Sequence, residues 1–279
     1  MTGEVPSTPD IEAVRQFWNQ HPLFVGEARH AAGERAFFEE HRRIIVAEHS
    51  GAIDPIFTRD IRPGQRVLDV GCGIGFWVQH LSATGALVSA CDLTPAAVEI
   101  TRQRIAMYGL SADVQVGNAE ALPYADGQFD HVNCQGVIHH TPDTARCIAE
   151  FARVLRPGGT ASVSVYYRSL VLESPRLYKL VVGLARPFVK VPGRGREQML
   201  LAATPDELVR QYDGAGNPIG RAYTRDEFRA LLGNHLELVE FRRFGFPRRF
   251  LPVGVPDAVH RTLSRSFGLM LLARCRKPA

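Results

Sequence analysis

Two short apolar runs in this chain are followed by residues that are suited to holding a nucleoside. The run 67–70 predicts a buried parallel strand, and the glycines after it allow a tight turn in which a ligand can lie against the backbone. Asp92 stands nineteen residues after Gly73, where the second strand of a βαβ unit should end, and its carboxylate can accept both hydroxyls of a ribose. The pattern predicts an adenosine-cofactor site. Its glycines are Gly71, Gly73 and Gly75.

The position of the third glycine in this motif indicates which type of cofactor the site would bind. A dinucleotide fingerprint, G-x-G-x-x-G, requires glycine at position 76, and that position is Phe76. The observed pattern is G-x-G-x-G with Asp69 before it, which disfavours a nicotinamide cofactor. Together with four later segments it resembles the class I S-adenosylmethionine (SAM) methyltransferases, across residues 60–167. The four segments are 117–124, 129–132, 136–143 and 153–159.

The order of expected elements predicts an α/β fold. Strands and helices alternate from residue 66 to residue 167, which favours a parallel sheet with right-handed crossovers. The resemblance implies a Rossmann-like, seven-stranded, mostly parallel sheet flanked by helices, with the last strand inserted antiparallel between its neighbours. We expect an N-terminal helical lid over residues 1–50, a SAM-binding core over 51–167, a helical cap insertion over 168–222 and the C-terminal part of the core over 223–279.

The resemblance also implies a set of cofactor contacts at the carboxyl ends of the strands. The first loop would hold the methionine end of SAM, the second its ribose and adenine, the third its adenine and the fourth its sulfonium end. The family usually has Asp where this chain has Asn118, whose carbonyl can still accept from the adenine amino group. The candidate cofactor residues are Asp69, Gly71, Cys72, Gly73, Gly75, Asp92, Leu93, Asn118, Ala119, Glu120 and Gln135.

His139 and His140 are the catalytic candidates, because histidine can take a proton at neutral pH. The alternative is that the pair only shapes the loop after the fourth strand, since many resembling chains carry it whatever they methylate. We expect no metal site at this pair with Asp143, because adjacent side chains should diverge and no further ligand has a suitable spacing.

Aromatic and basic side chains supply candidate substrate contacts. Trp18 could close over the sulfonium, and Tyr166, Tyr167 and Arg168 could line the pocket floor or anchor the insertion. Packing in the core is the alternative for each ring. From residue 242 to residue 279 there are nine basic residues and one acid, which indicates either a solvated basic surface or attraction of an anionic substrate.

These features predict a SAM-dependent methyltransferase that acts on a small molecule by in-line displacement. One alternative keeps the cofactor but attacks another carbon of SAM, for example by cyclisation of SAM with release of methylthioadenosine. A second alternative is a non-catalytic SAM-binding protein, which the intact motif set disfavours. The acceptor, the attacked atom and the oligomeric state are left open.

The composition limits which partners and which cellular compartment we expect for the protein. A net charge of +4 is too small to indicate a nucleic-acid partner, and no base-methylating motif or RNA-binding module occurs. No apolar run approaches the length of a membrane span, and no signal sequence is visible at the N-terminus. The five cysteines form no C-x-x-C pair, which favours buried, reduced thiols. We therefore expect a cytoplasmic protein without a membrane or nucleic-acid partner.

Overall fold

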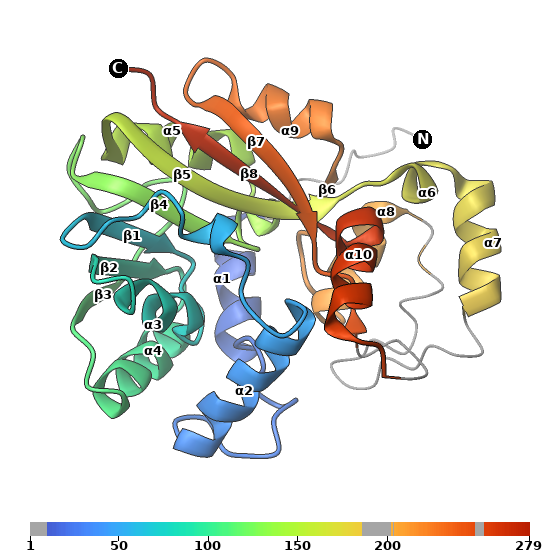
Figure 1. The fold of residues 1–279 in the computed structure, drawn as a ribbon, viewed down its shortest axis with the longest axis horizontal. Coiled ribbons are helices and arrows are strands. Elements are labelled where there is room, and N and C mark those ends of the chain that lie inside the picture. Colours follow the sequence, from blue (N-terminus) through green and yellow to red (C-terminus); the bar gives the residue numbers. More distant parts are fainter. Residues whose placement is uncertain (1–9, 186–201, 203, 249–253) are drawn as a thin grey trace, which may run out of the picture.

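The computed structural model describes residues 10–185, 202, 204–248 and 254–279. A single sheet crosses the molecule with strand order β3-β2-β1-β4-β5-β8-β7, and short β6 pairs with the end of β5 (Figure 1). The strands are β1 (Arg66–Val70), β2 (Leu87–Asp92), β3 (Ala112–Val116), β4 (Phe129–Gln135), β5 (Leu155–Tyr167), β6 (Ala222–Tyr223), β7 (Glu237–Phe244) and β8 (Met270–Arg276).

Helices flank the sheet and extend beyond its carboxyl edge. Those that enter the argument below are α1 (Ile11–Gln20), α2 (Arg35–Glu48), α3 (Phe76–Ser82), α4 (Pro95–Met107), α5 (Thr144–Val154), α8 (Pro205–Asp213), α9 (Arg225–Leu232) and α10 (Asp257–Phe267). Short helices η1 (Pro55–Phe57) and η2 (Ile138–His140) lie in loops, and α6 (Leu170–Glu173) and α7 (Pro175–Ala185) follow β5.

The sheet is mostly parallel, as the sequence predicts. β1 to β5 pair in parallel, whereas β8 runs antiparallel between β5 and β7. The predicted insertion of the last strand between its neighbours is therefore confirmed. The sheet has one strand more than predicted, because β6 adds a two-residue parallel pairing at Tyr166 and Tyr167. The expectation that residues 168–222 contain no strand is wrong at their last residue, Ala222.

Apolar side chains on both faces of the sheet build the core. One cluster joins β4, β5 and β8 to helices α5 and α9, with Phe151 and Phe228 fully buried. The opposite face packs on α3 and α4 through Val78, Leu81 and Val98. Burial on both faces explains why the parallel strands are continuously apolar in sequence.

Local sequence sets where the helices near the site begin. Asp10 caps α1 by accepting from the backbone N–H of Ala13, and Thr94 caps α4 with Pro95 in its first turn. α8 begins in the same way, with Thr204 as its cap and a proline next to it. The predicted lid contains α1 and α2, and the predicted cap insertion contains α6 to α8. Residues 1–9 of the lid, and 186–201 and 203 of the insertion, lie outside the described residues.

Two further expectations can be compared with the fold. All five cysteines are buried and free, as predicted. Residues 257–267 form α10, which the sequence analysis did not predict, and the last strand, β8, begins after it at Met270. Across the part of the chain that the structure describes, no helix is both long enough and apolar enough to cross a membrane.

Candidate functional site

The loop between β1 and α3 exposes backbone at the carboxyl end of the sheet. Gly71, Gly73 and Gly75 all have positive φ angles, between 53° and 77°, a backbone conformation that residues with a side chain rarely adopt. A Cβ on Gly71 would lie 2.3 Å from a methyl carbon of Val137. Only glycine at position 71 therefore leaves room for Val137, which belongs to the loop after β4. No atom lies within 4 Å of the position that a Cβ on Gly73 would take, which leaves this backbone open to a ligand.

Asp92, at the end of β2, holds this loop in place. One carboxylate oxygen accepts from the backbone N–H of Gly73 at 3.0 Å, and the other accepts from the N–H and the hydroxyl of Thr94. Burial raises the pKa of Asp92, while these hydrogen bonds counteract the shift. The carboxylate remains partly exposed toward the cavity described next.

A cavity lies over the carboxyl ends of β1 to β4 and beneath α1. Side chains and backbone from the loops after all four strands meet at its wall. The candidate cofactor residues that line it are Gly71, Gly73, Asp92, Leu93, Asn118, Ala119 and Gln135. Its chemistry fits an adenosine cofactor, because an acid, an amide and exposed loop backbone converge on a largely apolar space.

Four of the candidate cofactor residues do not line this cavity and instead stabilise its loops. Cys72 is buried with its sulfur 3.7 Å from the hydroxyl of Thr101, and Gly75 begins α3. Glu120 accepts from the backbone N–H of Asp143 at 2.6 Å, which ties the third loop to the start of α5.

Asp69 is the fourth, and it is almost fully buried within β1. One of its oxygens accepts from the side-chain amide of Asn133 at 2.7 Å, and the other has no hydrogen-bond partner among the described residues. Burial is the main cause that raises the pKa of Asp69 to about 7. Asp69 therefore links β1 to β4 within the sheet, and it is not among the residues that line the cavity.

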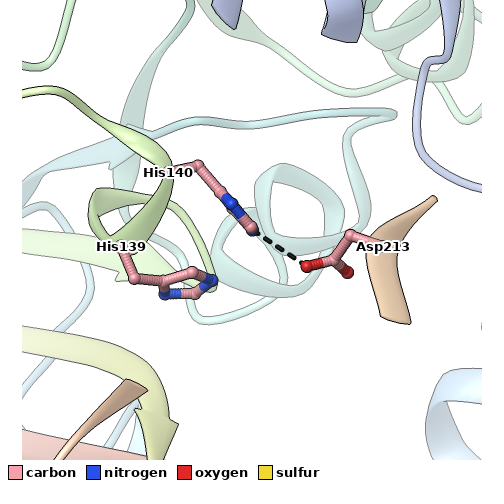
Figure 2. Close-up of side chains that lie close together, drawn as sticks. All are labelled: His139, His140 and Asp213. Atoms are coloured by element: carbon pink, nitrogen blue, oxygen red, sulfur yellow. Dashed lines mark ion pairs between the residues drawn. The ribbon is translucent and has the colours of Figure 1, made fainter. Parts of the chain in front are cut away.

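His139 and His140 lie in η2, and the structure brings Asp213 to them from the end of α8. The two imidazole rings have centroids 4.2 Å apart, so the expectation that these adjacent side chains diverge is wrong. One nitrogen of each imidazole and one oxygen of Asp213 all lie within 4.8 Å of one another. Figure 2 shows both imidazoles directed toward the carboxylate of Asp213.

Only one of the two histidines faces the cavity. His140 lines it together with Asp213, and its Nε2 lies 3.0 Å from an oxygen of that carboxylate. His139 is fully buried behind it, and neither of its ring nitrogens has a hydrogen-bond partner among the described residues. Burial, followed by the nearby His140, lowers the pKa of His139 well below its usual range, so its ring is neutral.

The candidate substrate residues separate into two groups. Trp18 lies at the cavity wall, with its ring 5.2 Å from that of His140. Tyr166 donates its hydroxyl proton to Asp213 at 2.9 Å, and the guanidinium of Arg243 lies over the ring of Tyr167. Arg168 pairs with Glu227. None of these last three predicted residues lines the cavity. Only Tyr166 contacts the insertion through these side-chain interactions, at Asp213, whereas the partners of Tyr167 and Arg168 lie in β7 and α9.

The sequence analysis missed the acid of this site. Asp213 lies in the cap insertion, far along the chain from η2, and no spacing rule connects it to a histidine pair. It also missed that α1 contributes apolar wall residues Ile11 and Val14 beside Trp18. The apolar stripe of α1 was visible in the sequence, but it is equally typical of a helix that packs on a sheet.

Comparisons with known proteins agree with this geometry. A family model described as a methyltransferase domain matches residues 68–163. The ubiquinone biosynthesis O-methyltransferase of Thiobacillus denitrificans is 34% identical over 160 residues, which are 57% of this chain and 67% of that protein. The match with the same-named protein of Aromatoleum aromaticum covers 64% of its length.

Two solved structures share the fold over most of the chain. A SAM-dependent methyltransferase from Methanosarcina mazei has a TM-score of 0.56 at 21% identity, covering 81% of this chain and 98% of that one. The cyclase SpnF has a TM-score of 0.58 at 15% identity, covering 99% of this chain and 98% of that one. At these identities the likeness concerns the fold alone.

Proposed function

The chain belongs to the class I SAM-dependent methyltransferases, and we propose that it transfers the methyl group of SAM to a hydroxyl oxygen of a small molecule. The observation that carries this proposal is the shared cavity. The cofactor loops around Asp92 form one side of this cavity, and the polar pair His140 and Asp213 forms the other side. A methyl donor and a hydroxyl acceptor would thus meet in one cavity.

The cofactor residues of the cavity would each hold one part of SAM. Asp92 accepts the ribose hydroxyls, and Asn118 and Leu93 contact the adenine. The open backbone at Gly73 and the side chain of Gln135 lie nearest the methionine and sulfonium end. Gln135 is held in position because its amide donates to Asn133 and to the carbonyl of Ser162. The closed, pre-formed loop geometry supports this assignment.

Positioning supplies most of the acceleration in such a transfer. Bound SAM offers an activated methyl group, whose bond to sulfur breaks as the bond to the acceptor oxygen forms, with the electron pair passing to sulfur. α1 covers part of the cavity with Ile11, Val14 and Trp18, which limits the orientations of a small acceptor. The acceptor hydroxyl must also lose its proton, and His140 with Asp213 forms the polar wall where that loss would be assisted.

The acceptor is proposed as a small molecule because the site is a concave cavity. The cavity is bordered by α1 on one side and by Asp213 from the insertion, so it suits a compact ligand better than a folded macromolecule. The O-methyltransferase names of the relatives support oxygen as the attacked atom.

The test is to incubate the purified chain with SAM and follow the products by mass spectrometry, first alone and then with a panel of catechols, phenols and sugars. We expect SAM to persist until an acceptor is added, after which S-adenosylhomocysteine and a product heavier by one methylene appear together. Asp213→Asn should lower kcat for that acceptor at least about 10-fold, while Asp226→Asn, an exposed acid on α9, leaves kcat unchanged.

Two outcomes would overturn the proposal. Consumption of SAM alone with release of methylthioadenosine would establish cyclisation of SAM in place of methyl transfer. Tight binding of SAM with no turnover on any member of the panel, in a chain whose Asp92→Asn variant loses that binding, would favour a non-catalytic SAM-binding protein.

A further inference from the structure

The hydrogen bonds of His140 determine where its ring protons lie. Its Nδ1 is 2.6 Å from the carbonyl oxygen of Ile219 and 3.4 Å from the side-chain nitrogen of Asn217. A carbonyl oxygen at 2.6 Å can only accept, so Nδ1 carries a hydrogen and donates it to Ile219. In the neutral ring, Nε2 is then left with a lone pair and no hydrogen.

That lone pair points at a second electron-rich atom. Nε2 of His140 lies 3.0 Å from Oδ2 of Asp213, while the other oxygen of this carboxylate accepts from the hydroxyl of Tyr166 at 2.9 Å. Two unprotonated acceptors at 3.0 Å repel each other, and both groups are largely removed from water. A cation between them, either a proton or a metal ion, removes this conflict.

His139 distinguishes between the two cations. A single proton shared by His140 and Asp213 leaves both nitrogens of the fully buried His139 without partners among the described residues. A metal ion would bind one of them. The ring of His139, beside His140 and Asp213, is the third ligand that a shared proton does not use.

We propose that a divalent transition-metal ion binds between His139, His140 and Asp213. This proposal deepens the proposed function, since the acceptor would meet the ion, but metal binding itself does not depend on methyl transfer. Two imidazoles and one carboxylate form a ligand set typical of Zn²⁺ and Fe²⁺ sites, whereas Mg²⁺ and Ca²⁺ prefer oxygen ligands.

The geometry needs only small adjustments. Ligand atoms around one tetrahedral ion lie about 3.3–3.4 Å apart when the bonds are about 2.0–2.1 Å long. The three candidate atoms already lie within 4.8 Å of one another. Rotation of the ring of His139 would close the remaining difference. No described residue hydrogen-bonds to this ring, which packs against the rings of His140 and Tyr166.

The surroundings of the three ligands also match a metal site. A ligating histidine commonly donates its other N–H to a carbonyl, as His140 does to Ile219, and a ligating carboxylate is commonly hydrogen-bonded, as Asp213 is by Tyr166. Such partners fix the ring and the carboxylate in their ligating orientation.

The ion would be reached from the cavity. Because His140 and Asp213 line it, a vacant coordination position would face the acceptor. An acceptor hydroxyl bound there would become more acidic and would pass its proton to a water molecule. Its oxygen would then form the bond to the methyl carbon as the carbon–sulfur bond breaks and the electron pair passes to sulfur.

The test uses the untagged chain, stripped with a chelator and titrated with Co²⁺, whose visible absorption reports imidazole and carboxylate ligation. We expect one Co²⁺ per chain, displaced by one equivalent of Zn²⁺. Asp213→Asn and His139→Ala should each weaken binding at least about 10-fold. His235→Gln, which removes an exposed imidazole elsewhere, should leave the titration unchanged. Circular dichroism and thermal midpoints would show that each variant is folded.

Methyl transfer is measured on the same samples, so that the two proposals can fail separately. Absence of Co²⁺ binding, or equal binding by the wild type and by folded Asp213→Asn, overturns the metal site and assigns the cation to a proton. Full methyl transfer by such a metal-free chain would leave the proposed function intact. Stoichiometric, Asp213-dependent metal binding without methyl transfer to any acceptor would establish the metal site and contradict the proposed function.

Discussion

At the scale of single residues, Asp92 holds the loop and is also the proposed ligand of the ribose. Its two oxygens already accept from the backbone of Gly73 and from Thr94, so the carboxylate is held in place without a cofactor. Each carboxylate oxygen can accept more than one hydrogen bond, and Asp92 lines the cavity. The proposed ribose contact would therefore require no rearrangement of this side chain.

The variant Asp92→Asn tests this double role. The amide keeps one acceptor but loses the charge and replaces the other oxygen with a donor, which would face either Gly73 or Thr94. We expect SAM to bind about 10–100-fold more weakly, because hydrogen bonds to a charged group contribute about 1.5–3 kcal/mol. Isothermal titration calorimetry with SAM measures the change. The matched control is Asp113→Asn, an exposed acid on β3, which should bind SAM like the wild type.

At the scale of elements, the loop between β1 and α3 contains one glycine that should affect mainly the stability of the fold and another that should also affect the affinity for SAM. Gly71 and Gly73 share a left-handed backbone, but their surroundings differ. A side chain on Gly71 would collide with Val137, whereas one on Gly73 would enter the open space of the cavity. Glycine at position 71 is thus required for the loop to fold, and glycine at position 73 leaves the backbone accessible to a ligand.

Alanine at each position should show this difference in urea unfolding and SAM titration. Gly73→Ala should lower the free energy of unfolding by about 1–2 kcal/mol, the cost of a left-handed residue with a Cβ, and should also weaken SAM binding. Gly71→Ala should lose about 1–3 kcal/mol more because of overpacking.

Gly64→Ala is the control for both variants. It has a φ of +79° and no atom within 4 Å of its Cβ position, but it lies before β1 and away from the cavity. It should lose stability like Gly73→Ala and keep its SAM affinity. Equal SAM affinity in all three variants would mean that the cofactor does not approach the backbone at Gly73.

The elements that the sequence predicted are those whose signals are local. β1 and β2 are mostly apolar runs followed by glycine or ending in aspartate. The same short segment therefore predicts the strand, the loop after it and the candidate ligand group. Most of the candidate cofactor residues therefore line the cavity, and their contacts with SAM stay a prediction. Asp69 and Cys72 do not line it, because a residue beside a loop can point either into the sheet or into the cavity, and periodicity alone does not decide between them.

The remaining features depend on contacts between distant segments. Asp213 reaches His140 only because the insertion folds back over the sheet, with α8 tied to β5 through Tyr166. The helix α10 was missed for a related reason. Its buried side chains are the polar residues His260 and Ser264, so no apolar stripe marks its buried face in the sequence.

At the scale of the whole molecule, buried histidines should make the fold sensitive to acid. Burial lowers the pKa of His41 to about 3 and those of His49 and His131 to about 4. In the unfolded chain each ring binds its proton near pH 6.5. Below that pH the unfolded state binds more protons than the native state, so stability falls as the pH falls. Asp69 opposes this trend, because its raised native pKa stabilises the fold below pH 7.

Burial also lowers the pKa of His139, so four histidines against one carboxyl group leave about three net protons taken up on unfolding near pH 5.5. We therefore expect the free energy of unfolding to drop by roughly 4 kcal/mol per pH unit between pH 6 and 5. Urea unfolding across this range measures the slope. His41→Leu should reduce the slope by about one proton, because His41 is buried against Phe24 and Phe76 and its Nδ1 has no partner among the described residues. His30→Gln, at an exposed position, should leave it unchanged. A slope that His41→Leu does not alter would mean that this ring is protonated in the native state, and the acid sensitivity would then arise from other groups.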